Sequence, residues 1–135
     1  MKVHGGCHCG AIRYQADVDP ARASICHCSD CQRLTGTAYR VSVPTRREDF
    51  VLLSGAPTLY VKTTADSGRP RVQAFCGACG SPLYTRAAAE DFQSYGLRVG
   101  CLDERRELAP RRQIWCGSAM PWAMRLDDVP RRDGE

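Results

Sequence analysis

The sequence lacks any long apolar run, and its first residues lack the apolar stretch of a secretory signal. No segment approaches the roughly 20 apolar residues that a membrane-spanning helix needs, so we expect no membrane association. Residues 1–7 read MKVHGGC and contain no apolar segment. No signal peptide is therefore expected, and the predicted location is cytoplasmic. Internal repeats and low-complexity linkers are also absent, which excludes a repeat array.

A strong excess of charge of one sign is missing too. The 19 Lys and Arg residues are set against 15 Asp and Glu residues, for a formal net charge of +4. Many arginines lie in the last third of the chain, but acidic residues are interleaved with them, which is typical of a solvated mixed-charge surface. No stripe of aromatic and basic residues indicates a single-strand binder, so nucleic acid is not an expected partner.

Cysteine, by contrast, is abundant, with nine in 135 residues. An odd number cannot be fully paired within one chain, and thiols stay reduced in the cytoplasm. Metal binding is therefore the favoured explanation, and structural disulfides are the alternative. Most of these cysteines fall into three short clusters: Cys7 and Cys9; Cys26, Cys28 and Cys31; and Cys76 and Cys79.

Short alternating stretches separated by turns predict a mainly β fold. In residues 11–18, Ile12, Tyr14, Ala16 and Val18 alternate with polar residues, as in a half-buried strand. Similar patterns occur in residues 39–43, ending at Pro44, and in residues 50–53, 59–63, 72–76, 82–86, 95–102 and 112–116. We expect one domain over residues 1–130 and a disordered tail over residues 131–135.

Two segments have helical character. Ser29 or Asp30 is a candidate N-cap for a short helical turn that ends at Thr35, with Gly36 as its stop. Such a turn would direct backbone N–H groups at the sulfur of Cys28. Residues 87–92 are the second segment, for which we expect a brief helix.

The three cysteine clusters can be divided between metal sites in two ways. Joining the first pair to the last gives the four-thiol cluster, Cys7, Cys9, Cys76 and Cys79, a closed set of the kind found in structural zinc sites. The middle cluster then stands alone as the three-thiol cluster, Cys26, Cys28 and Cys31, with an open fourth position as in catalytic zinc sites. The other division joins that triad to the last pair as a zinc ribbon, although ribbons space their pairs by only ~15–20 residues.

The remaining cysteines and the histidines carry no comparable signal. Cys101 and Cys116 lie in expected strands, where buried and unreactive thiols are common. His27 stands between two ligand candidates and is expected to point away from the metal. His4 and His8 have no signal beyond their nearness to the first pair.

The order of these motifs resembles one known family, the zinc enzymes named for glutathione-dependent formaldehyde activation, whose domain also occurs in centromere protein V. The resemblance rests on residues 6–10 (GCHCG), 26–31 (CHCSDC) and 75–81 (FCGACGS). Later features agree with it: residues 99–103 (VGCLD), Trp122 and residues 128–130 (DVP). The match spans about residues 4–130.

The resemblance implies a β-tent zinc-binding fold of short antiparallel strands with two zinc ions per chain. A structural zinc would take the four-thiol cluster, and a catalytic zinc would take Cys26, Cys28 and Cys31. The implied activity is that of a carbon–sulfur lyase acting on thiol–aldehyde adducts such as S-hydroxymethylglutathione, with glutathione or another small thiol as the partner. In our hypothesis the metal stabilises the thiolate of the incoming thiol, which then attacks the aldehyde carbonyl.

The residues that assist the reaction, the function and the oligomeric state each have alternatives. Asp30, Arg33 and His27 are candidates for assisting with protons or charge. A non-catalytic zinc module that binds a protein or nucleic-acid partner through the basic C-terminal third is the main alternative function, and zinc storage or sensing by the triad is another. No pattern decides between a monomer and a homodimer.

Overall fold

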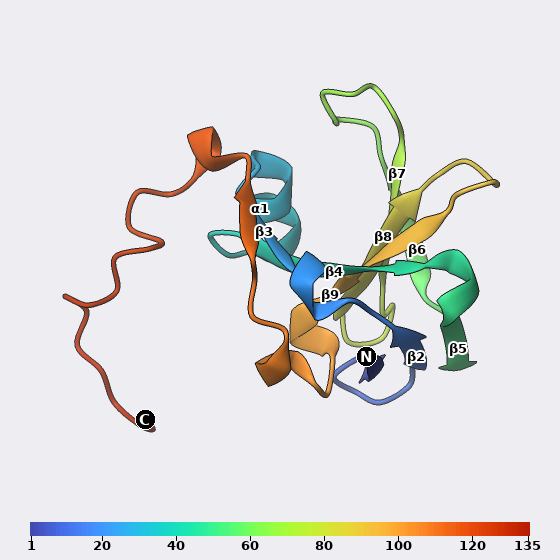
Figure 1. Ribbon diagram of the computed structural model, residues 1–135, viewed down its shortest axis with the longest axis horizontal. Coiled ribbons are helices and arrows are strands. Elements are labelled where there is room, and N and C mark those ends of the chain that lie inside the picture. The colour runs from blue at the N-terminus through green and yellow to red at the C-terminus, as the bar shows by residue number, and fades with distance from the viewer.

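The computed structural model describes all 135 residues and consists mainly of short β-strands in two sheets (Figure 1). The smaller sheet has the order β1 (Lys2–Gly6), β2 (Arg13–Asp17), β5 (Phe50–Ser54). The larger sheet has the order β10 (Arg112–Ile114), β3 (Ser24–Cys26), β4 (Arg40–Arg46), β9 (Ser94–Arg98), β8 (Pro82–Ala87), β7 (Arg71–Phe75), β6 (Thr58–Lys62). All pairs are antiparallel except β10 with β3. The prediction of a mainly β fold is confirmed.

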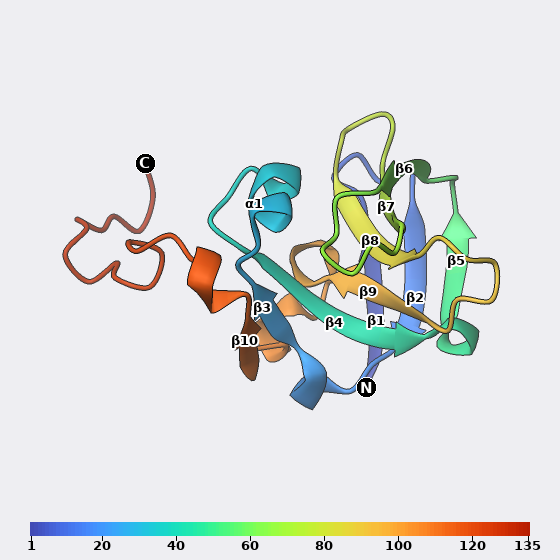
Figure 2. The ribbon, with the colours of Figure 1, turned by 90° about the horizontal axis from the view of Figure 1, so that it is seen from above.

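The helices are few and short. The α-helix is α1 (Ser29–Thr35), and it lies beside β3 and β4 (Figure 2). The 3-10 helices are η1 (Pro20–Arg22), η2 (Arg47–Asp49), η3 (Val99–Cys101), η4 (Arg105–Glu107) and η5 (Cys116–Ser118). None of these helices has the length and apolar character that crossing a membrane would require.

The hydrophobic core lies between the two sheets. Ile12, Tyr14, Ala16 and Val18, the alternating residues that predicted a strand, are all buried and belong to one apolar cluster. From the larger sheet the same cluster includes Val43, Leu83 and Leu97, each of them fully buried. Each such large side chain contributes about 1.5–3 kcal/mol by leaving water, so this packing stabilises the two sheets against each other.

Helix α1 has the predicted extent but a different N-cap. It ends at Thr35, and Gly36 follows in the left-handed conformation with φ of 66°. The N-cap is Cys28, whose sulfur accepts a hydrogen bond from the backbone N–H of Cys31 at 3.3 Å. The predictions of Ser29 or Asp30 as the cap are therefore wrong. The predicted N–H group directed at the sulfur of Cys28 is confirmed.

Two further expectations are corrected by the strand pairing. β4 continues through Pro44 to Arg46. Proline has no N–H to donate, but β3 pairs with β4 only from Arg40 to Ser42, so no hydrogen bond to β3 is lost at Pro44. Residues 87–92 form no helix, because β8 and β9 pair directly on either side of them and the chain must reverse there.

The C-terminal segment carries little regular structure. β10 ends at Ile114, so the predicted strand over residues 112–116 is shorter than expected and Cys116 lies in η5. Residues 119–135 follow without strand or α-helix, and they lead away from the two sheets (Figures 1 and 2).

Candidate functional site

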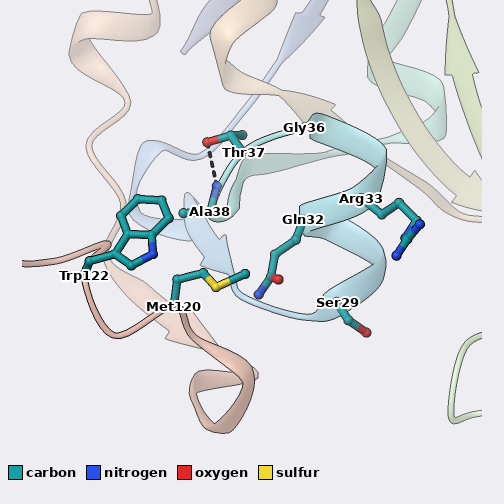
Figure 3. Close-up of a pocket in the computed structure, with 8 residues that line it drawn as sticks. All are labelled: Ser29, Gln32, Arg33, Gly36, Thr37, Ala38, Met120 and Trp122. Atoms are coloured by element: carbon teal, nitrogen blue, oxygen red, sulfur yellow. Dashed lines mark hydrogen bonds between the residues drawn. The ribbon is translucent and has the colours of Figure 1, made fainter.

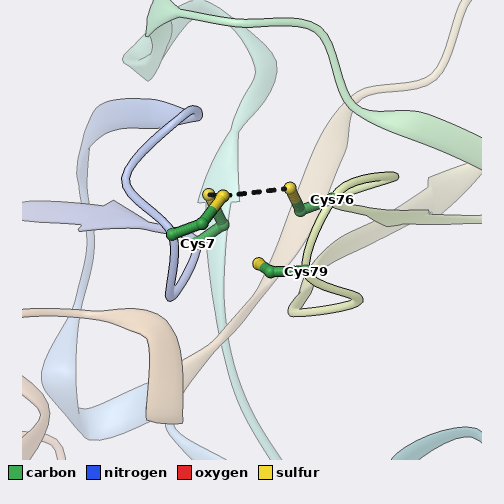
Figure 4. Close-up of side chains that lie close together, drawn as sticks. Cys7, Cys76 and Cys79 are labelled. Atoms are coloured by element: carbon green, nitrogen blue, oxygen red, sulfur yellow. Dashed lines mark hydrogen bonds between the residues drawn. The ribbon is translucent and has the colours of Figure 1, made fainter.

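The four-thiol cluster joins two turns that are distant in the sequence. The turn after β1 supplies Cys7 and Cys9, and the turn between β7 and β8 supplies Cys76 and Cys79. Figure 4 shows Cys7 facing Cys76 and Cys79. The four sulfurs lie within 4.8 Å of one another. The Sγ atoms of Cys7 and Cys9 are 3.5 Å apart, and those of Cys9 and Cys76 are 3.8 Å apart. Tetrahedral zinc with Zn–S bonds of about 2.3 Å places sulfurs roughly 3.8 Å apart, so these four residues fit such an ion.

Local hydrogen bonds stabilise the anionic form of two of these thiols, those of Cys7 and Cys79. The backbone N–H of Ile12 donates to Cys7 Sγ at 3.2 Å. Hydrogen bonds from the side chain and the backbone of Ser81 lower the pKa of the Cys79 thiol to about 5. Gly80 has a φ of 78°, which lets the chain turn sharply between Cys79 and Ser81. The turn is therefore shaped to present thiolates to a cation.

The three-thiol cluster is built at the junction of β3 and α1. Cys26 ends β3, Cys28 caps α1 and Cys31 lies in its first turn. All three sulfurs lie within 4.8 Å of one another, and Cys28 Sγ is 2.9 Å from Cys31 Sγ. Cys26 and Cys31 are buried, whereas Cys28 is half-buried. A hydrogen bond from Cys31 lowers the pKa of the Cys26 thiol to about 5 against the opposing effect of burial, while the same contact raises the pKa of Cys31.

His27 points away from these sulfurs and holds the loop in place. Its ring is fully buried and its Nε2 lies 2.7 Å from Gln113 Oε1. The side-chain amide of Gln32 donates to the carbonyl of His27 at 2.8 Å and to the carbonyl of Ser118 at 2.9 Å. These two glutamines had no signal in the sequence. They act as anchors for the segment that carries Cys26 and Cys28.

A cavity of about 310 Å³ opens beside Cys28. Its walls include Lys62 and Arg71, from the ends of β6 and β7, and Trp115, which follows β10. Asp30 also lines it, with Oδ2 2.9 Å from Lys62 Nζ and accepting a hydrogen bond from Thr64 Oγ1 at 2.7 Å. Sequence patterns missed Lys62, Arg71 and Trp115, because Trp115 follows a strand at one edge of the larger sheet and the other two come from the opposite edge, and they approach the thiols only in the folded chain.

A second cavity, of about 570 Å³, lies between α1 and the C-terminal segment (Figure 3). Gln32 and Arg33 line it from the helix, and Met120 and Trp122 line it from the C-terminal segment. The guanidinium of Arg33 points away from Met120 and Trp122 (Figure 3). No cysteine lines this cavity, so it is less suited to thiol chemistry than the cavity at Cys28.

The other cysteines and histidines lie outside both clusters. Cys101 is half-buried in η3, and its thiol donates to the carbonyl of Pro82 at 3.0 Å. Cys116 is exposed. The expectation that both are buried in strands is therefore wrong. His4 pairs through Nδ1 with Glu104 Oε1 at 2.9 Å, and His8 is exposed.

The chain is similar to proteins of one known family and to a solved structure. A family model described as "Glutathione-dependent formaldehyde-activating enzyme" matches residues 2–118. A Halomonas elongata protein, named "Putative glutathione-dependent formaldehyde-activating enzyme", is 28% identical over 87 residues, which is 62% of this chain and about half (55%) of that protein's length. The crystal structure of a Rhodobacter sphaeroides protein has a TM-score of 0.62 and 27% identity, and the match covers 84% of this chain and 99% of that one.

Proposed function

The chain belongs to the glutathione-dependent formaldehyde-activating enzyme family, and from this premise we propose that it is a zinc-dependent carbon–sulfur lyase acting on thiol–aldehyde adducts. A structural zinc in the four-thiol cluster and a catalytic zinc in the three-thiol cluster are part of the proposal. So are a single domain over residues 1–130, of the β-tent type, and a location in the cytoplasm, where these thiols would stay reduced.

One observation carries the proposal: the three-thiol cluster has a half-buried member that borders a cavity. Cys28 lines the cavity of about 310 Å³, while Cys26 and Cys31 are buried behind it. Three thiols with room beside one of them are typical of a catalytic zinc site, which keeps a position for substrate. A closed set of four thiols, such as Cys7 with Cys9, Cys76 and Cys79, is typical of a structural site.

The chain's own residues would supply binding and orientation. Cys26, Cys28 and Cys31 would hold the ion, and zinc bound there would stabilise the thiolate form of an incoming thiol, which is the nucleophilic form. The cavity walls, with Trp115 and Lys62 among them, would hold the rest of the thiol and the aldehyde close to Cys28. Holding two reactants in one cavity removes much of the entropic barrier to their reaction.

The overall reaction is balanced without an oxidant or reductant. A bond forms between the thiol sulfur and the aldehyde carbon, the carbonyl π bond breaks, and the thiol proton ends on the carbonyl oxygen. The reverse reaction releases the thiol and the aldehyde. The proposed substrates are small thiols, glutathione among them, because the related proteins are named for it.

The test is the exchange rate between formaldehyde, glutathione and S-hydroxymethylglutathione, measured by NMR exchange spectroscopy. Zinc-loaded wild-type protein is expected to accelerate the exchange, and Cys28→Ser is expected to abolish the acceleration. Cys116→Ser is the matched control, because this thiol is exposed and belongs to neither cluster. If wild-type protein with two zinc ions leaves the exchange of formaldehyde with glutathione and with smaller thiols unchanged, the proposal fails.

A second candidate is a non-catalytic module that binds a partner through its C-terminal segment. Trp122, Met124 and Leu126 are each more than half exposed there, and arginines lie among them. Binding of nucleic acid that weakens steeply with added salt, in protein without lyase activity, would favour this candidate.

A further inference from the structure

One face of the seven-stranded sheet is unusually cationic. Residues directly opposite each other on paired strands share a face, as do residues two apart on one strand. From β3 to β6, the register therefore places the following side chains on the same face: Cys26, Arg40, Arg98, Gln73, Arg71 and Lys62. A hydrogen bond of 2.6 Å from Arg98 Nη2 to Gln73 Oε1 runs along this face across β8.

Few anionic side chains form ion pairs with these cations. Lys62 is paired with Asp30 at 2.9 Å, and Arg98 donates only to the uncharged side chains of Gln73 and Ser42. Neither Arg40 nor Arg71 belongs to any ion pair. Three guanidinium groups therefore share one face without a carboxylate between them.

Burial makes this arrangement costly. Arg40 Nε and Nη1 are buried and have no hydrogen-bond partner, and an unpaired buried charge is strongly unfavourable. Burial lowers the pKa of Arg71, and the like charge of Arg40 lowers it further. Burial likewise lowers the pKa of Arg98 to about 9, again with a contribution from Arg40. The three groups therefore repel one another in a partly desolvated region.

The thiols offset only part of this charge. Cys26, at the end of this face, belongs to the three-thiol cluster. Three thiolates around a divalent ion carry a formal charge of minus one, and Asp66, which also lines the cavity, adds a second negative charge. One of the three guanidinium charges is then left without compensation. An anionic ligand would supply the missing charge. The cavity in which it would meet both Arg71 and Cys28 is the one of about 310 Å³.

We propose that Arg71, in the positive field of Arg40 and Arg98, binds a carboxylate of the thiol substrate in the cavity beside Cys28. This inference rests on the proposed function and extends it to a substrate class, the small thiols that carry a carboxylate. The planar guanidinium of Arg71 can donate two parallel hydrogen bonds to a carboxylate, which fixes the orientation as well as the charge of the ligand. The substrate sulfur would then be directed towards Cys28.

The test compares two thiols that differ only in charge, 3-mercaptopropionate and 3-mercaptopropanamide. Their binding to zinc-loaded protein is measured by isothermal titration calorimetry, with the zinc content and the circular dichroism spectrum checked for each variant. Wild-type protein is expected to prefer the carboxylate on the order of tenfold, as a charge-assisted hydrogen bond provides. Arg71→Gln is expected to remove the preference, because it weakens the binding of the carboxylate thiol and leaves that of the amide unchanged.

Two further variants sharpen the result. Arg69→Gln is the matched control, because Arg69 is exposed in the loop just before β7 and lies outside the cavity, so the preference should persist. Arg71→Lys keeps the charge but loses the planar fork, so it should lower the preference even if Arg71→Gln fails to fold. Equal binding of the two thiols by wild-type protein, or an unchanged preference in both Arg71 variants, overturns the subsite and leaves the proposed function standing. If neither thiol binds wild-type protein, the subsite is overturned, whereas the proposed function is decided separately by the exchange of formaldehyde with glutathione.

Discussion

His27 Nε2 lies 2.7 Å from Gln113 Oε1, although the two residues are 86 positions apart in the sequence. This contact ties the segment that carries Cys26 and Cys28 to β10. The other ring nitrogen, Nδ1, is buried without a partner, so the bond to Gln113 is the one hydrogen bond that the buried ring makes. The position of the three-thiol cluster therefore depends on a residue from the far end of the chain.

Gln113→Met is expected to lower the free energy of unfolding by about 1–3 kcal/mol, because it leaves His27 buried with no hydrogen-bond partner. Urea unfolding of the zinc-loaded protein measures the change. Gln93→Met is the matched control, because Gln93 is exposed, as Gln113 is, but its side chain donates only to the nearby carbonyl of Asp91. Equal stability of the two variants would contradict a structural role for the contact between His27 and Gln113.

Cys28→Ser is expected to lose about one zinc ion per chain while the fold survives. Cys28 is the half-buried member of the three-thiol cluster, and only α1 and its flanking loop depend directly on it. Elemental analysis of protein purified without chelator, with circular dichroism on the same samples, measures both quantities. Wild-type protein should contain two zinc ions. A single zinc in both proteins would mean that the three-thiol cluster does not retain metal.

Cys76→Ser is expected to unfold the chain, or to lower its stability far more than Cys28→Ser does. The four-thiol cluster joins the turn after β1 to the turn after β7, and metal binding to such a site contributes directly to folding. Thermal unfolding of the two variants side by side provides the measurement. The division into structural and catalytic clusters is wrong if Cys28→Ser proves as destabilising as Cys76→Ser.

Gly5→Ala is expected to destabilise the protein by about 1–3 kcal/mol, because the core has no room for a methyl group there. A Cβ at Gly5 would lie 2.5 Å from the ring of Tyr14, which is fully buried. Gly100→Ala is the control, since a Cβ at Gly100 would meet no atom within 4 Å. Guanidinium unfolding of both variants should separate them clearly. A Gly5→Ala variant as stable as wild type would show that the ring of Tyr14, which is paired with Gly5 in the same sheet, can move aside.

The local elements near the cysteines were largely predictable. The extent of α1, its stop at Gly36 and the N–H group directed at Cys28 Sγ all follow from residues close to one another in the sequence. The cap itself was not predicted, because a thiol replaces the usual hydroxyl or carboxylate at that position. Alternation in residues 11–18 correctly indicated the buried side chains of β2.

The wrong expectations arose where tertiary contacts outweigh local preference. Residues 87–92 are rich in alanine, a good helix former, yet Arg86 pairs with Tyr95 across the turn. Phe92 is buried beneath the guanidinium groups of Arg47 and Arg86, at 4.2 and 4.6 Å from its ring centroid. Packing of this aromatic ring replaces the helix that the composition favours.

By itself, the sequence determined the number, type and local spacing of the thiols and the β-rich character of the chain, since each of these follows from residues within a few positions of one another. It also determined the family, through the order of short motifs along the chain. Only the tertiary structure decided which sulfurs meet, because Cys9 and Cys76 are 67 positions apart and come together through the two sheets. The cationic face was likewise decided by strand register. Arg40, Arg71 and Arg98 lie on three different strands, and no periodicity along the chain reveals that they share a side of one sheet.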